Sequence, residues 1–139
     1  MNKLLFLDFD GVLHPTHFAG EDPFNRADLL EDVLANLQVE IVISSSWRFT
    51  HSVSKLQKLL PSGISKLIIG TTGAPVIGKH PRFNEIQVYL NNREDADWRA
   101  LDDSYWEFPS PCPQLIRCNP NTGMSQKQAL ELNQWLRGE

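Results

Sequence analysis

The sequence has few cysteines, no long apolar run and little net charge. Two cysteines among 139 residues are too few for the disulfide framework of a small secreted domain. No apolar stretch approaches the roughly 20 residues that a membrane-spanning helix needs. The net charge of -4 gives no electrostatic reason for tight nucleic-acid binding. Because Met1 leads into a strand-like run and not into a signal peptide, we expect a cytoplasmic protein.

The two cysteines, Cys112 and Cys118, lie six residues apart in a proline-rich stretch. In a reducing compartment we expect two unpaired thiols. A zinc site would need further ligands from the four histidines, and no Cys-x-x-Cys or His-x-x-x-His spacing is present. We therefore expect no zinc site.

Short apolar runs alternate with stretches of helical periodicity along most of the chain. Leu4 to Leu7 is an unbroken apolar run, and Val39 to Ile43 is rich in β-branched residues, so both segments favour strands. Ser125 and Gln128 have the spacing of a helix capping box. The complete pattern predicts strands at 4–7, 39–43, 66–69, 98–101 and 115–118, and helices at 26–37, 53–60, 83–90 and 125–136.

Repeated β-α-β units predict a Rossmann-like α/β/α domain with three layers and a mostly parallel sheet of about five strands. The sequence has no internal repeat, low-complexity tract or linker, so we expect one domain over residues 1–139. The segment 14–25 is too short to form a second domain. We therefore expect a minimal cap or none, and an open site.

The most informative segment is the apolar run at 4–7, which ends in Asp8-Phe9-Asp10-Gly11. Two carboxylates so close to a buried strand repel each other and lose hydration unless a cation lies between them. A divalent cation would relieve this repulsion and leave one carboxylate to react with a phosphate. The segment thus predicts a phosphoryl-transfer site, although Asp and Gly also favour simple turns.

Two further polar clusters follow predicted strands: Ser44-Ser45-Ser46 and Asp102-Asp103. The carboxyl ends of parallel strands meet at one edge of a sheet, so we expect both clusters to lie near Asp8 and Asp10. Taken alone, the serine run could only cap the next helix, and the aspartate pair could only be solvated. Their joint placement is the stronger indication of a site.

The chain resembles the haloacid dehalogenase (HAD) superfamily of phosphatases, whose first motif is an apolar strand followed by Asp-x-Asp-Gly-Val/Thr-Leu. It is similar in particular to the small HAD-like group that includes the HAD domain of Swiss Army Knife RNA repair proteins. The segments that carry the narrower resemblance are Ile43-Ser44-Ser45-Ser46-Trp47-Arg48, Arg82-Phe83-Asn84-Glu85-Ile86, Leu101-Asp102-Asp103 and Asn119-Pro120-Asn121-Thr122-Gly123-Met124-Ser125.

The resemblance implies a magnesium-dependent phosphohydrolase that forms an aspartyl-phosphate. Asp8 would be the nucleophile, and Asp10 would be the general acid and then the general base. Mg²⁺ would be held by Asp8, by the backbone carbonyl of Asp10 and by Asp102. Asp103 would be an additional ligand or would support the others.

Two choices between neighbouring residues follow from the same resemblance. We choose Ser45 as the hydroxyl that binds the transferred phosphoryl group, with Ser44 as the alternative after a shift of one residue. The cation beside the phosphate would be Arg82 or Lys79, and we favour Arg82, which fits an Arg-x-x-Glu-Ile pattern. The residues expected to bind substrate in addition are Phe9, Gly11 and Ser44.

Several residues near these motifs permit more than one interpretation. His14 and His17 could reach a substrate or could be exposed to solvent. Trp47 and Arg48 could serve packing and ion pairing only. The strand predicted before the aspartate pair contains Arg99 and few β-branched residues, which is unusual for a buried strand.

The substrate is left open, because a fold does not determine it. A nucleotide, another small phosphomonoester, a phosphoprotein and a phosphorylated nucleic-acid end all fit, and neither a membrane nor an obligate protein partner is indicated. One alternative function is a phosphotransferase that passes the group to an alcohol. Another is a non-catalytic phospho-acceptor or binding module; receiver domains, however, place the acidic pair and the acceptor on different strands, whereas Asp8 and Asp10 follow one strand.

Overall fold

The computed structural model describes residues 3–17 and 22–138, and its centre is one parallel sheet. The five strands lie in the order β3-β2-β1-β4-β5, and every neighbouring pair is parallel. The strands are β1 (Lys3–Leu7), β2 (Glu40–Ile43), β3 (Ile68–Thr71), β4 (Asp97–Asp102) and β5 (Leu115–Arg117). The Rossmann-like α/β fold predicted from the sequence is confirmed.

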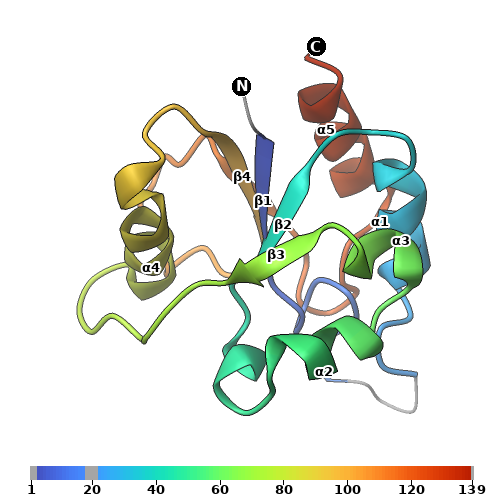
Figure 1. Cartoon of the computed structure of the whole chain (residues 1–139), viewed down its shortest axis with the longest axis horizontal. Coiled ribbons are helices and arrows are strands. Elements are labelled where there is room, and N and C mark those ends of the chain that lie inside the picture. Colours follow the sequence, from blue (N-terminus) through green and yellow to red (C-terminus); the bar gives the residue numbers. More distant parts are fainter. Residues whose placement is uncertain (1–2, 18–21, 139) are drawn as a thin grey trace.

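Helices cover both faces of the sheet (Figure 1). On one face lie α1 (Ala27–Leu34), α3 (Ser62–Ser65) and α5 (Gln126–Leu136), and on the other lies α4 (Pro81–Tyr89). The short α2 (Val53–Lys58) lies near the carboxyl ends of the strands. Two 3-10 helices complete the elements, η1 (Ser46–Phe49) and η2 (Leu90–Asn92).

The central strand β1 is apolar throughout its buried part because both of its faces are covered. Leu5 and Leu7 pack into the core on the side of α1, α3 and α5. Leu4 and Phe6 pack into the second core, which includes Ile86 of α4. The uninterrupted apolar run is therefore what this position in the sheet requires.

The predicted helix at 53–60 is confirmed as α2, and a second short helix, α3, which the sequence did not predict, follows it. The carbonyl of Pro61 accepts hydrogen bonds from the backbone N–H groups of Ile64 and Ser65, so the proline begins α3. Ile64 is fully buried in the core. Because α3 extends to Ser65, the next strand starts later than predicted, at Ile68.

Arg99 lies in β4 although its charge is unusual for a strand next to the sheet centre. Its guanidinium lies 5.3 Å from the ring centroid of Trp135 in α5 and contacts Asp97 Oδ1 at 3.3 Å. The Trp135 indole N–H also donates to Asp97 Oδ1 at 3.0 Å. The charge is thus accommodated by an aromatic ring and a carboxylate, which local strand propensity does not describe.

The structure confirms the predicted capping box of the last helix and the two unpaired thiols. The backbone N–H of Ser125 donates to Gln128 Oε1 at 2.9 Å, as the capping box requires. Cys118 and Cys112 are free, and burial raises the pKa of both thiols. Within the described part of the chain, no helix combines the length and the apolar character needed to cross a membrane.

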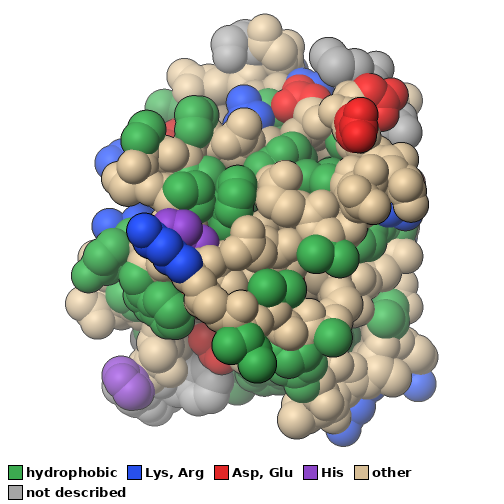
Figure 2. Space-filling view, turned by 90° about the vertical axis from the view of Figure 1, so that its left-hand side faces the viewer, with side chains coloured by type: hydrophobic (Ala, Val, Ile, Leu, Met, Phe, Trp, Pro, Cys, Tyr) green, Lys and Arg blue, Asp and Glu red, His purple; other side chains and the backbone are tan. Residues whose placement is uncertain are grey.

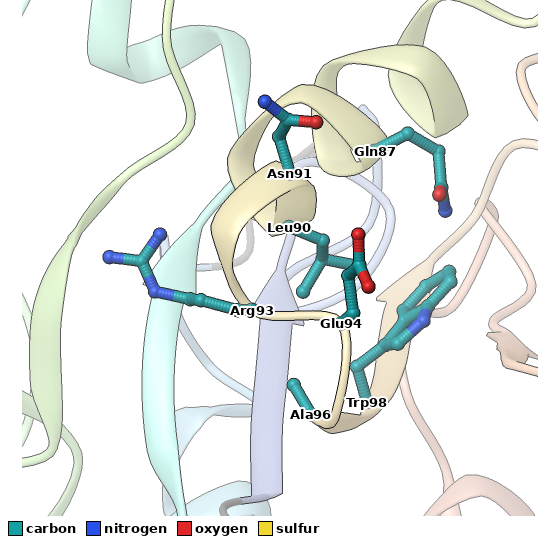
Figure 3. A pocket seen from close by; sticks show the side chains of 7 residues that line it. All are labelled: Gln87, Leu90, Asn91, Arg93, Glu94, Ala96 and Trp98. Carbon is teal, nitrogen blue, oxygen red and sulfur yellow. The ribbon is translucent and has the colours of Figure 1, made fainter.

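Two surface features are an apolar face over α4 and a cavity beside it. The face over α4 carries separate apolar groups (Figure 2). Val88 in α4 is 66% exposed, and Ile77, in the loop between β3 and α4, is 98% exposed. A cavity of about 310 Å³ lies between the end of α4, η2 and the first residues of β4 (Figure 3). Its wall includes Trp98, which pairs with Leu4, so the cavity lies at the amino end of the sheet.

The segment after β5 packs closely against the loop that follows β1. The backbone N–H of Met124 donates to the Val12 carbonyl at 2.7 Å. Gly123 has a φ of +78°, and a Cβ at this position would lie 2.8 Å from the same carbonyl oxygen. Gly138 has a similar φ of +76°, but a Cβ there would meet open space.

We predict that Gly123→Ala destabilises the protein more than Gly138→Ala does. Both variants place a side chain at positive φ, which costs about 1–2 kcal/mol, and only Gly123→Ala adds a clash with backbone. The free energy of unfolding, measured by urea denaturation, should fall by at least about 1 kcal/mol more for Gly123→Ala. Equal losses in the two variants would contradict this close approach.

Candidate active site

Four buried polar residues lie side by side at the carboxyl edge of the sheet: Thr72, Ser44, Asp8 and Asp102. Backbone hydrogen bonds continue the parallel pairing to this row, from Ser44 N to the carbonyl before Asp8 and from Thr72 N to the carbonyl before Ser44. All four residues are at most 5% exposed. The residues before Asp8 and Ser44 pack toward α1, so strand alternation directs the row toward the face that α4 covers.

The carboxylates of Asp8, Asp102 and Asp103 form one cluster, in which one oxygen of each lies within 4.8 Å of the others. Arg82 Nη1 lies 3.4 Å from Asp8 Oδ1 and 2.5 Å from Asp102 Oδ2. Arg82 Nη2 lies 3.6 Å from Glu107 Oε2. Three carboxylates therefore contact this guanidinium, and together with the neighbouring Asp103 the cluster keeps an excess of negative charge.

The pKa values of the two most buried aspartates reflect this excess. Burial raises the pKa of Asp8 well above its usual value, and repulsion by Asp102 adds to the rise although Arg82 opposes it. Burial likewise raises the pKa of Asp102 to about 6, again against the effect of Arg82. One cation thus does not compensate the loss of hydration at this edge of the sheet.

Arg82 reaches the cluster because α4 begins directly before it. The backbone N–H of Phe83 donates to the Glu107 carbonyl at 3.1 Å and anchors the first turn of α4 to the loop that follows β4. Lys79 lies outside this turn, is exposed, and has its carbonyl bonded by Asn84 Nδ2 at 2.7 Å. The structure brings Arg82, and not Lys79, against the predicted nucleophile.

The cluster fits a divalent cation that prefers oxygen ligands. Asp8, Asp102 and Asp103 supply only carboxylate oxygens, which are the ligands that Mg²⁺ takes in proteins. Gly11 is needed for this arrangement, because a Cβ at its φ of +76° would lie 2.2 Å from Asp103 Oδ2. The absence of a side chain at Gly11 therefore lets Asp103 join the other two aspartates.

Asp10 lies in a different environment from Asp8, although they are two residues apart. Its Oδ1 is 2.8 Å from His14 Nε2, and its Oδ2 accepts a hydrogen bond from Trp47 Nε1 at 3.2 Å. His14 is fully buried, and its Nδ1 accepts a hydrogen bond from the Phe24 backbone N–H at 3.1 Å. Nδ1 is therefore unprotonated, and the ring donates from Nε2 to Asp10.

The hydrogen bonds from His14 and Trp47 favour the charged form of the Asp10 carboxylate. The hydrogen bond from His14 lowers the pKa of Asp10, and that from Trp47 lowers it further against the opposing effect of partial burial. The Asp10 side chain is 44% exposed, so it can still meet a substrate or water. The sequence left the role of His14 open, and the structure places it against Asp10. His17 is exposed, next to residues 18–21, which the structure does not describe.

The structure also separates the two candidate serines. Ser45 Oγ accepts a hydrogen bond from the Trp47 backbone N–H at 3.2 Å and caps η1. Ser44 lies directly beside Asp8 in the row at the sheet edge. The sequence choice of Ser45 over Ser44 is therefore not favoured by the geometry, because the side chains alternate along the strand. Thr72, which the sequence analysis did not single out, has a buried hydroxyl without a hydrogen-bond partner among the described residues.

Phe9 and Gly11, predicted to bind substrate, have other contacts in this structure. The Phe9 side chain is fully buried and packs edge-on against Phe24 and Trp47. The Gly11 backbone N–H donates to the His14 carbonyl at 2.9 Å. Only the backbone of Phe9 is directed at the site, where its N–H is bonded to the Asp8 carboxylate.

A buried ion pair between Arg48 and Glu85 connects the end of β2 with α4. Arg48 Nη2 lies 2.8 Å from Glu85 Oε1, and Nη1 donates to the Ser44 carbonyl at 2.8 Å. Glu85 Oε2 accepts a hydrogen bond from the Val76 backbone N–H at 3.1 Å. The two side chains are 3% and 8% exposed. The pair holds the serine segment after β2 against α4. The sequence analysis named both residues, but in separate motifs and without pairing them.

Comparison with known proteins identifies one family. A family model described as the HAD domain in Swiss Army Knife RNA repair proteins matches residues 4–129. No curated protein and no solved structure matches the chain significantly. The matched range includes the cluster at the ends of β1 and β4, the serines after β2 and Arg82 of α4.

We predict that Glu85→Gln lowers the free energy of unfolding by about 3 kcal/mol, because it leaves the buried Arg48 charge without its partner. Thermal and urea denaturation measure the loss. Glu94→Gln, at an exposed position after η2, is the matched control and should change stability by less than about 0.5 kcal/mol. Similar stabilities of the two variants would show that the Arg48–Glu85 pair contributes little.

Proposed function

Because the chain belongs to the family of HAD domains found in Swiss Army Knife RNA repair proteins, we propose that it is a magnesium-dependent phosphomonoesterase acting through an aspartyl-phosphate. The observation that carries this proposal is the position of Asp8. Its carboxylate lies 3.4 Å from Arg82 and within the carboxylate cluster of Asp102 and Asp103. A nucleophile, a cation for the phosphate and ligands for a metal thus meet at one point.

In the first half of the reaction, an Asp8 oxygen attacks the phosphorus of the substrate. The new bond joins Asp8 to phosphorus, and the bond between phosphorus and the leaving-group oxygen breaks. Asp10 in its protonated form donates a proton to that oxygen, so that an alcohol leaves. Arg82 neutralises charge on the oxygens of the transferred group.

In the second half, water attacks the phosphorus of the aspartyl-phosphate. Asp10, now a carboxylate, accepts a proton from the water, and the bond between phosphorus and Asp8 breaks. Inorganic phosphate leaves, and Asp8 is restored. The two hydrogen bonds that lower the pKa of Asp10 favour the carboxylate that this step requires.

Asp8, Asp102 and Asp103 are the residues that would hold Mg²⁺. When bound, the ion would neutralise the negative charge of the phosphate and of the nucleophile, so that the two can approach. Ser44 is our preferred donor to a phosphoryl oxygen, because it lies beside Asp8 while the Ser45 hydroxyl caps η1.

We assign His14 and Trp47 as positioning residues that act through Asp10. Each donates to a different oxygen of the Asp10 carboxylate, so together they fix its plane and its distance from the substrate. His14 is in turn fixed by the Phe24 backbone N–H. Neither residue needs to contact the phosphate in this arrangement.

We predict that Asp8→Asn removes phosphomonoesterase turnover while the protein stays folded. Turnover is measured with Mg²⁺ on nucleotides, sugar phosphates, phosphopeptides and phosphorylated oligonucleotides, and chelation of the metal should abolish it. The carboxamide cannot form the aspartyl-phosphate, so the loss should exceed about a thousandfold. Asp28→Asn, at an exposed position in the first turn of α1, is the matched control and should retain full turnover.

Normal turnover by Asp8→Asn would exclude this mechanism. Higher product formation in the presence of alcohols, with transfer of the phosphoryl group to them, would identify a phosphotransferase instead. A stable phosphorylated protein without turnover would identify a phospho-acceptor module.

We predict that His14→Ala lowers kcat at least about tenfold, because a misplaced catalytic group costs up to about a hundredfold. KM should change little, since His14 contacts Asp10 and not the substrate. His14→Gln, which retains an N–H donor near the same place, should recover part of kcat. Equal kcat values for the Ala and Gln variants, or a rise in KM alone, would contradict the positioning role.

A further inference from the structure

A polar cavity of about 660 Å³ lies at the carboxyl end of β5, next to the carboxylate cluster. Its described wall contains two cationic side chains and five amide or hydroxyl side chains, and it contains no carboxylate. The residues that characterise the cavity are Arg117, Asn119, Asn121, Thr122, Ser125 and Lys127. In a chain with a net charge of -4, such a wall is a local concentration of positive charge and hydrogen-bond donors.

The positive charges of this cavity are not compensated by acidic side chains. Arg117 Nε donates to the Asp103 backbone carbonyl at 3.4 Å, and its guanidinium lies 4.5 Å from the Tyr105 ring centroid. Neither Arg117 nor Lys127 forms an ion pair with any residue that the structure describes. Both side chains are exposed and can therefore meet an anion from solution.

Asp103 connects the cavity with the proposed catalytic centre. Its carboxylate belongs to the cluster with Asp8, while its backbone carbonyl holds Arg117 in the cavity wall. Thr16 makes a second connection, since its N–H donates to the Pro120 carbonyl at 2.8 Å and its Oγ1 lies 3.5 Å from Asp103 Oδ2. Asp103 thus joins the carboxylate cluster to the cavity wall, and Thr16 contacts both Asp103 and Pro120 of that wall.

We propose that this cavity binds a second phosphate group of the substrate, distinct from the group that is transferred. The assignment rests on the proposed phosphomonoesterase function. A phosphate offers several acceptor oxygens, which match a wall of cations, amides and hydroxyls, and charge-assisted hydrogen bonds are stronger than neutral ones. The second phosphate is either a phosphomonoester of a small bisphosphorylated molecule or a phosphodiester of an oligonucleotide.

The test compares adenosine 3′,5′-bisphosphate with adenosine 5′-monophosphate, which differ by one phosphate. Binding of each is measured by calorimetry with Mg²⁺ on the full chain carrying Asp8→Asn, so that no turnover is needed. We expect the bisphosphate to bind at least about tenfold more tightly at low salt, and this advantage should shrink as salt increases. A third probe, a 5′-phosphorylated trinucleotide, presents phosphodiesters instead.

Lys127→Met is the decisive variant, because Lys127 has an exposed side chain at the second position of α5. It should reduce the advantage of the bisphosphate or of the trinucleotide about fivefold and leave monophosphate binding unchanged. Lys66→Met, an exposed lysine at the end of α3, is the matched control and should change none of the affinities. Arg117→Met should act like Lys127→Met and provides a second, independent variant.

A loss confined to the bisphosphate assigns the subsite to small molecules, and a loss confined to the trinucleotide assigns it to a phosphodiester. Unchanged ratios in Lys127→Met and Arg117→Met, or equal losses for all three probes, would overturn the proposal. Failure of the proposed function has a different result: no phosphomonoester is hydrolysed by the wild-type chain, whatever the binding ratios are.

Discussion

The contact between one guanidinium and the buried carboxylates of Asp8 and Asp102 is the interaction on which the site depends. Parallel pairing of β1 with β4 places these two aspartates next to each other, where neither can keep its full hydration. Arg82 reduces their repulsion from the first turn of α4, but the raised pKa of Asp8 shows that one positive charge is not enough. A further cation at this edge of the sheet would reduce the remaining repulsion.

The pKa of Asp8 is raised and the pKa of Asp10 is lowered, because the chain leaves the sheet between the two residues. Asp8 still belongs to the buried row, so burial raises its pKa. Asp10 follows in a loop, where His14 and Trp47 donate to its two oxygens and lower its pKa. Two residues of the same type, separated by a buried phenylalanine, thus have different charge behaviour because their partners differ.

The sequence predicted the features that depend on local pattern and missed those that depend on contacts between distant segments. The apolar run at 4–7 and the carboxylates after it identify a central strand and its polar carboxyl end, because burial on both faces demands such a run. The Arg-x-x-Glu-Ile pattern favoured Arg82 over Lys79, but the physical reason is where α4 begins, which brings Arg82 against Asp8 and leaves Lys79 exposed. The same holds for Ser44 and Ser45, whose side chains can be assigned only once the register of β2 is known.

Backbone hydrogen bonds join the loops around the site, and they set the position of the cavity beside β5 relative to Asp8. The loop after β1 is joined to the segment after β5 by hydrogen bonds from Met124 N to the Val12 carbonyl and from Thr16 N to the Pro120 carbonyl. Gly123 allows this approach, because a side chain there would meet the Val12 carbonyl. Backbone bonds of this kind hold two loops more firmly than exposed side-chain contacts do. These backbone bonds consequently set the position of the cavity beside β5 relative to Asp8, so that, under the proposed second-phosphate subsite, the spacing of two phosphates on a ligand would decide how well it binds.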